Sequence, residues 1–147
     1  MESNTIPTGK RYGCLTSEID AAYHEAAAKF GLSDSAMRIL YTICLSGETC
    51  LLSDIIRLSG ISKQTINSSL RKLETDGILF LEAAEGRRKN VCLTEAGKAL
   101  ARNSVRRVLE AENEIFGAWT REEQDLYMEL TERFLLSFRK KIKELAT

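Results

Sequence analysis

The segment from residue 53 to residue 75 restricts the fold of this chain most, because its pattern predicts two helices joined by one tight turn. A short helix is expected from Ser53 to the turn residue Gly60. Ser62 has the side chain of an N-cap directly before a longer helix that ends at Gly77. The inward residues of this longer helix are expected to be Ile66, Leu70 and Leu73. Two helices around a glycine-containing turn are typical of a helix-turn-helix.

The opposite face of the longer helix carries short hydrogen-bonding and basic side chains instead of the Glu–Lys pairs of an ordinary solvated face. Asn and Gln can pair bidentately with adenine, Arg and Lys can contact guanine, and a helix N-terminus with its cap hydroxyl can face a phosphate. We therefore expect the DNA-contacting residues of this helix to be Ser62, Lys63, Gln64, Thr65, Asn67, Ser68 and Arg71.

A short basic hairpin is expected directly after the longer helix. The segment from Ile78 to Ala83 predicts a strand, a polar turn with Gly86 follows, and the segment from Asn90 to Leu93 predicts the returning strand. A basic hairpin tip can enter a narrow minor groove, and a charged solubilising turn is the alternative. The neighbouring helix-turn-helix favours the DNA contact. The wing residues expected to contact DNA are Arg87, Arg88 and Lys89.

Amphipathic helices are also expected before the helix-turn-helix. One is capped by Thr16 or Ser17 and runs to about Phe30, and the next is capped by Ser33. Residues 1–15 are polar and without periodicity, so we expect them to form a flexible N-terminal arm.

After the hairpin, one helix is expected to begin at Thr94, and the last opens at Thr120, whose spacing to Glu123 is that of a capping box. The apolar stripe of the last helix is longer than one small winged helix can cover. Such a stripe suggests a subunit interface, and two-fold dimers are the commonest oligomers. The alternative is packing onto the chain's own first helix, and we expect both. The expected interface residues are Ile19, Tyr23, Leu126, Leu130, Phe134, Phe138 and Ile142.

These elements predict a mainly α fold with a small β-hairpin wing, in which a winged helix-turn-helix is combined with a helical dimerisation region. We expect a single domain over residues 16–147, with the winged helix-turn-helix at about 33–94 and dimerisation helices at about 16–30 and 95–146. One proline and nine glycines in 147 residues agree with long helices. The net charge is zero, with 21 basic and 21 acidic residues, so basic surface has to be local.

Other classes of protein receive little support. The four cysteines are dispersed without a Cys-x-x-Cys pair and His24 is the one histidine, so we expect no metal site and no cofactor. Buried thiols are expected at Cys44 and Cys92, and an exposed thiol at Cys14 without a redox role. No phosphate loop or nucleophile motif indicates an enzyme. The absence of a signal-peptide pattern and of an apolar run of roughly 18 residues predicts a cytoplasmic protein.

In this order and spacing, several segments resemble the MarR family (multiple antibiotic resistance regulators). They are residues 51–55, 62–66, 70–78, 85–87 and 91–97. The family usually has Asp-x-Arg at the wing and Leu-Thr-x-x-Gly after the next strand. Glu85 stands for that aspartate and Arg87 for the wing arginine, while Ser68 stands where the family often has an arginine. The resemblance implies a pocket between the dimerisation helices and the winged helix.

The sequence therefore predicts a sequence-specific regulator of transcription that binds double-stranded DNA, not an enzyme. We expect a homodimeric, ligand-responsive repressor that recognises a pseudo-palindromic operator and responds to a small-molecule effector, without contact to a membrane. The alternative is a winged-helix module that binds another protein. An apolar or acidic outer face on the second helix would favour that alternative, and this face is polar and basic.

Overall fold

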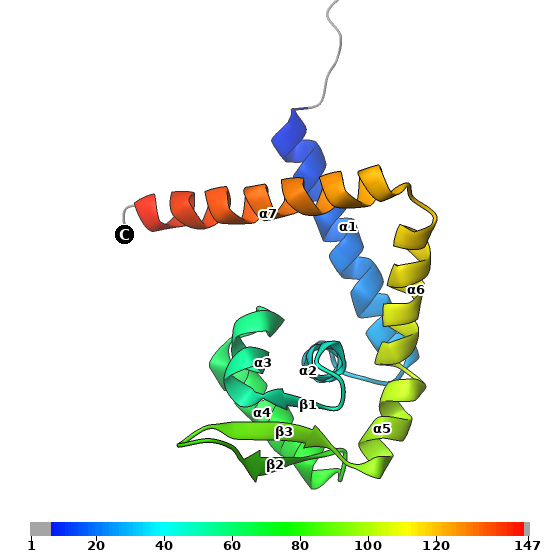
Figure 1. Ribbon diagram of the computed structural model, residues 1–147, viewed down its shortest axis with the longest axis vertical. Coiled ribbons are helices and arrows are strands. Elements are labelled where there is room, and N and C mark those ends of the chain that lie inside the picture. Colours follow the sequence, from blue (N-terminus) through cyan, green and yellow to red (C-terminus); the bar gives the residue numbers. More distant parts are fainter. Residues whose placement is uncertain (1–6, 146–147) are drawn as a thin grey trace, which may run out of the picture. The chain divides into compact units, whose positions relative to one another are not determined.

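Seven helices and three short strands make up residues 7–145, which are the residues that the computed structural model describes (Figure 1). In chain order they are α1 (Thr8–Lys29), α2 (Asp34–Leu45), β1 (Thr49–Leu51), α3 (Leu52–Ser59), α4 (Lys63–Thr75), β2 (Leu79–Ala83), β3 (Lys89–Leu93), α5 (Glu95–Arg102), α6 (Val105–Gly117) and α7 (Arg121–Glu144). The predicted fold class, mainly α with a small β wing, is confirmed. The chain divides into two structural units between Leu109 and Glu110.

The core of the first unit is built around α2, which lies among α3, α4, α5 and β1 (Figure 1). Ile39, Leu40 and Ile43 of this helix are fully buried, and Ile66 of α4 and Val91 of β3 are buried with them. Burial of one such aliphatic side chain contributes roughly 1.5–3 kcal/mol, so this cluster holds the helices of the first unit against the sheet.

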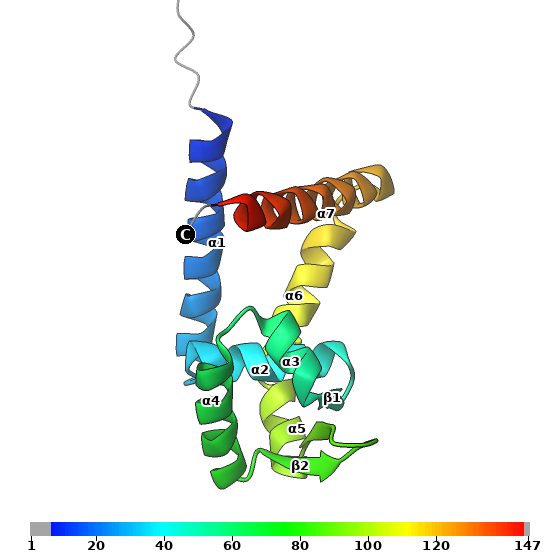
Figure 2. The same cartoon turned by 90° about the vertical axis from the view of Figure 1, so that its left-hand side faces the viewer.

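The sheet has the order β1-β3-β2 and is antiparallel throughout. The pairing joins Thr49 to Cys92 on one side of β3 and Leu79 to Leu93 on the other. β2 and β3 form the predicted hairpin, and β1 adds a third strand that the sequence did not predict. Figure 2 shows α1 extending away from the sheet at the far side of α2.

Serine and threonine side chains cap α2, α4 and α5 at the predicted helix starts. Ser33 accepts a hydrogen bond from the backbone N–H of Ala36 at 3.1 Å, and Thr94 accepts one from Gly97 at 3.0 Å. Each cap satisfies an N–H group that has no partner within the helix. These helix starts are therefore fixed by local chemistry.

The predicted flexible arm is wrong for residues 8–15, which belong to α1. Pro7 is the N-cap of that helix, and the hydroxyl of Thr16 donates to the carbonyl of Tyr12 at 2.9 Å instead of capping a helix start. Tyr12, Leu15 and Ile19 lie at helical spacing along α1, and each is about half exposed. Residues 1–6 of the predicted arm lie outside the described residues.

The helix predicted to run on from Thr94 is interrupted at Asn103 and Ser104, which separate α5 from α6. The backbone N–H of Ser104 donates to the carbonyl of Ala101 at 3.2 Å, three residues back, so the turn is tightened there. Ser104 is buried, and its hydroxyl donates to the carbonyl of Leu100 at 2.6 Å. The buried hydroxyl at the break between α5 and α6 is therefore hydrogen-bonded.

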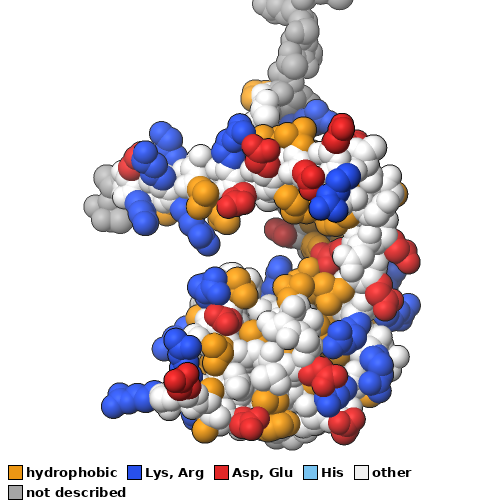
Figure 3. Space-filling view, in the orientation of Figure 1, with side chains coloured by type: hydrophobic (Ala, Val, Ile, Leu, Met, Phe, Trp, Pro, Cys, Tyr) orange, Lys and Arg blue, Asp and Glu red, His pale blue; other side chains and the backbone are white. Residues whose placement is uncertain are grey.

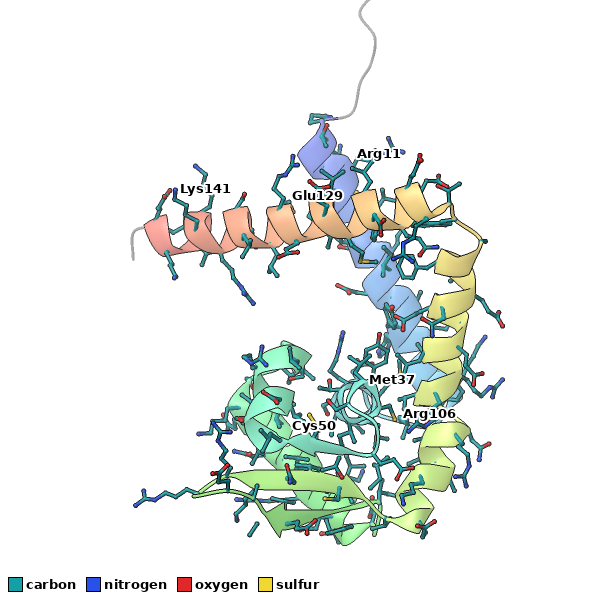
Figure 4. All side chains as sticks on the ribbon, in the orientation of Figure 1. Arg11, Met37, Cys50, Arg106, Glu129 and Lys141 are labelled. Atoms are coloured by element: carbon teal, nitrogen blue, oxygen red, sulfur yellow. The ribbon has the colours of Figure 1, made fainter. Side chains whose placement is uncertain are left out.

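Two polar contacts tie α5 and the start of α6 to the turn between α2 and β1. Lys98 forms ion pairs of 3.1 Å with both Glu48 and Glu95, and its hydrogen bonds to these carboxylates, Glu48 first, raise the pKa of the lysine. The guanidinium of Arg106, labelled in Figure 4, donates to the carbonyl of Gly47 at 3.0 Å. These contacts hold α5 and the start of α6 against the turn that precedes β1.

The second unit consists of the larger part of α6 and the whole of α7, which are joined by the short turn between Gly117 and Arg121. Thr120 and Glu123 form the predicted capping box, with hydrogen bonds of 3.1 Å and 2.9 Å in opposite directions. The rings of Phe116, Trp119 and Tyr127 pack edge-on or tilted at centroid distances of 5.1–6.0 Å. None of the described helices is long and apolar enough to cross a membrane.

Candidate nucleic-acid interface

The turn between α3 and α4 positions the outer helix of the first unit. Gly60 has φ +71°, a left-handed conformation that L side chains rarely adopt, and Ser59 accepts a hydrogen bond from the backbone N–H of Ile61 at 3.3 Å. The hydroxyl groups of Ser35 and Ser69 join α2 to α4 at 2.5 Å. The predicted inward residues of α4 are confirmed as buried: Ile66, Leu70 and Leu73.

The outward face of α4 forms one shallow hollow that is lined only by polar and basic side chains. Its lining residues are Lys63, Gln64, Asn67, Ser68 and Arg71. Four of them are exposed, whereas Asn67, which was expected on the exposed face, is half-buried. The hollow thus combines amide, hydroxyl, ammonium and guanidinium groups, which match the hydrogen-bonding edges of bases in a major groove.

Ser62 and Thr65 sit at the start of α4 and bond to each other. Their side-chain oxygens lie 2.9 Å apart, and Ser62 also accepts the backbone N–H of Thr65 at 3.3 Å. The Ser62 hydroxyl therefore serves as the N-cap of α4. The N–H groups of the first turn of α4 remain the groups best suited to a phosphate at this end.

The wing presents three basic side chains at the end of the β2–β3 hairpin. Arg87, Arg88 and Lys89 are exposed, and Figure 3 shows Lys and Arg side chains at this tip. The turn is closed by the backbone bond from Ala84 to the carbonyl of Arg88, 3.0 Å long. Among the described residues, no ion pair involves these three side chains, so their charges are not neutralised within the chain.

A cavity of about 410 Å³ lies where α1, α2 and the α3–α4 turn meet. Its wall includes Tyr23 and His24 from α1, Arg38 from α2 and Gly60 from the turn. Nδ1 of His24 lies 2.7 Å from both carboxylate oxygens of Asp34. Sequence patterns did not identify these residues as the wall of a cavity, because they come from three segments that only the fold brings together. The resemblance alone implied a pocket.

The residues predicted for a dimer interface lie mainly on α7, which buries none of its residues in the single chain. The exposed fractions of the five α7 residues range from 44% to 53%, and the rings of Phe134 and Phe138 stack at 5.6 Å. Ile19 of α1 is 49% exposed, whereas Tyr23 is half-buried against the core of the first unit. The interface itself stays a prediction.

The predicted exposure of Cys14 and burial of Cys44 and Cys92 are confirmed. Cys14 is exposed, while Cys44, Cys50 and Cys92 are buried. Burial raises the pKa of the Cys44 and Cys50 thiols, so less of the reactive thiolate forms at neutral pH. Among the described residues, no group of three or more side chains is arranged to hold a metal ion.

Residues 30–89 match the family model described as the MarR family. They contain α2 to α4 and the hairpin up to its tip. The match covers the winged helix-turn-helix and less than half of the chain. The chain is therefore similar to MarR-family transcriptional regulators over its winged helix-turn-helix.

Solved structures share the whole fold at low sequence identity. NMB1585, a MarR family regulator from Neisseria meningitidis, is 19% identical, with coverage of 95% of this chain and 99% of that chain and a TM-score of 0.82. S. aureus MepR in its DNA complex is 20% identical (92% and 99% coverage, TM-score 0.72). Bordetella bronchiseptica BpsR, whose DNA binding is regulated by 6-hydroxynicotinic acid, is 18% identical (84% and 98%, TM-score 0.61). No curated protein matches the chain.

Proposed function

We propose that this chain is a MarR-family regulator of transcription, a homodimeric repressor that binds a pseudo-palindromic operator and releases it when a small molecule binds. The observation that carries the proposal is the hollow on the outer face of α4, whose five lining side chains are all polar or basic. A face of this composition suits base edges and phosphates, and its lining includes no apolar side chain that would anchor a protein partner.

The two parts of the surface are expected to contact DNA differently. In the hollow, Asn67 and Gln64 can each make the paired hydrogen bonds that distinguish adenine, so α4 supplies sequence selectivity. At the wing, Arg87 and its basic neighbours meet the backbone or the minor groove and supply affinity that depends on salt.

The apolar face of α7 supports the proposed dimer. Leu126, Leu130 and Phe138 leave between 44% and 53% of their surface exposed, and an exposed stripe of this length suits a second copy of the same helix. A two-fold dimer would place two recognition helices on half-sites about one helical turn, roughly 34 Å, apart.

The response to a ligand is assigned to the cavity between α1, α2 and the α3–α4 turn. A molecule bound there would contact Ser59, Gly60 and Ile61, which directly precede the cap of α4. Its binding energy can therefore bias the position of the recognition helix, provided that the two positions differ in affinity for the ligand. BpsR, which shares the fold, is regulated by a small aromatic acid.

The test compares Asn67→Ala with Arg87→Ala on an operator selected from a random DNA pool and on unselected DNA, with salt titrated in each case. Asn67→Ala should cost about 1–3 kcal/mol on the operator and little on unselected DNA. Arg87→Ala should weaken both and reduce the salt slope by about one unit. Lys140→Ala, which removes an exposed charge from α7, is the matched control and should change neither.

Melting temperatures identify variants that are merely misfolded. If both variants bind the operator as tightly as wild type does, the assigned DNA surface is wrong. A winged-helix module that binds another protein would then be the better description.

A further inference from the structure

The cavity between α1, α2 and the α3–α4 turn is lined by ionisable groups of both signs. Asp20 and His24 come from α1, and Asp34 and Arg38 come from α2. His24 and Asp34 satisfy each other, because Nδ1 of the histidine lies 2.7 Å from both oxygens of the carboxylate. The ionisable groups of the wall that have no ion-pair partner among the described residues are the carboxylate of Asp20 and the guanidinium of Arg38.

These two remaining groups do not neutralise each other. Among the described residues, no ion pair within 4.0 Å includes Asp20 or Arg38, although both line the same cavity. A ligand with a single charge could form an ion pair with only one of these two groups. A ligand that carries both an ammonium and a carboxylate group can form an ion pair with each of the two side chains.

The other walls of the cavity are suited to an aromatic ring. Tyr23 and Tyr41 contribute rings, and Ala27, Met37 and Ile61 contribute apolar surface; Figure 4 labels Met37 on α2. A volume of about 410 Å³ lies within the range of roughly 300–1,000 Å³ that small-molecule sites occupy. The cavity therefore combines an apolar wall with two separated opposite charges.

We propose that this cavity binds an aromatic zwitterion of the amino-acid class. Asp20 pairs with the ammonium group and Arg38 with the carboxylate, for which the planar guanidinium offers two parallel donors. The ring packs against Tyr23 and Met37. This inference rests on the proposed ligand response and names the class of its effector.

The experiment measures binding to the full chain by titration calorimetry. The probes are L-phenylalanine and L-tryptophan, each with the deaminated acid (3-phenylpropionate or indole-3-propionate) and the decarboxylated amine (2-phenylethylamine or tryptamine). At least one amino acid should bind about tenfold or more tightly than either of its analogues, which corresponds to about 1.4 kcal/mol.

Two conservative variants test which side chain pairs with which charged group of the ligand. Asp20→Asn should reduce the affinity of the amino acid to that of the deaminated acid, and Arg38→Gln should reduce it to that of the amine. Glu18→Gln is the matched control, because Glu18 is an exposed acid of α1 outside the cavity lining. Asp20 and Arg38 are themselves exposed, so both variants should keep the wild-type melting temperature.

The proposal is overturned if neither amino acid binds below millimolar concentration, if a deaminated acid binds as tightly as its amino acid, or if both variants bind like wild type. Operator binding is measured in parallel on the same proteins. A wild-type protein that binds its operator and releases it with 3-phenylpropionate would retain the proposed function and refute the zwitterion. A wild-type protein that binds no DNA would refute the proposed function itself.

Discussion

Gly97 is the position at which one added methyl group should disturb the first unit most. It is the third residue of α5, it is buried, and its N–H donates to the cap oxygen of Thr94. An ideal Cβ built on Gly97 would overlap the carbonyl oxygen of Ile78 and lie 3.0 Å from the carbonyl carbon. That oxygen also accepts the backbone N–H and the hydroxyl of Thr94, both at 3.0 Å, so it is held in place.

The Gly97→Ala variant is therefore expected to lose stability. Relief of the overlap requires α5 to separate from the start of β2, because the obstacle is backbone and not a flexible side chain. Overpacking of this kind costs about 3 kcal/mol, whereas helix propensity alone would stabilise the variant by about 1 kcal/mol. For a chain of this size, the net loss should lower the melting temperature by roughly 4–8 °C.

Gly13→Ala provides the matched control. Gly13 also lies within a helix, but nothing is within 4 Å of its would-be Cβ, so helix propensity should dominate and stabilise the protein by up to about 1 kcal/mol. Urea denaturation of the two variants and wild type measures the difference directly. If Gly97→Ala is as stable as wild type, the close approach of α5 to Ile78 does not exist in solution, and the packing argument fails.

Three further predictions concern the dimer, the exposed thiol and the last helix. Replacing Phe134 and Phe138 by Asp should put two charges on the apolar face of α7 and give monomers in sedimentation velocity; a wild-type monomer at micromolar concentration would contradict the dimer. Cys14→Ser should leave operator binding unchanged before and after peroxide treatment, and protection of binding by this substitution would reveal a thiol switch. The backbone hydrogen bond from Thr120 lowers the pKa of Glu123, so this carboxylate stabilises the start of α7 above the ordinary value of 4.5 and loses the effect as the pH falls through the lowered pKa. Glu123→Gln should therefore make α7 helicity, measured by hydrogen exchange, less sensitive to acid, and identical acid profiles would disprove the role.

The sequence was informative wherever one short segment contains its own signal. The caps at Ser33, Ser62 and Thr120 were predicted because a side-chain oxygen and the N–H groups it satisfies lie within three residues of each other, and the helix start at Thr94 was predicted as well. The inward and outward faces of α4 were predicted for a similar reason, since helical spacing alone separates them. The predicted recognition surface depended on nothing beyond that segment and the adjacent hairpin.

The start of α1 shows the limit of local signals. Gly9 and Gly13 argue against a helix, and Thr16 has the side chain of a cap, so the helix was expected to begin too late. Each of these preferences is worth only about 1 kcal/mol, so none of them decides by itself where a helix begins.

Tertiary structure decided the features that need partners far apart in the chain. Three residues of β1 are too few to show a strand period, and their pairing with β3 joins segments about 40 residues apart. The requirement for glycine at position 97 comes from a carbonyl in another segment. The cavity likewise combines Asp20, Arg38 and Gly60 from three elements. Sequence periodicity records which face of an element is buried, but only the packed chain determines which residues meet across those faces.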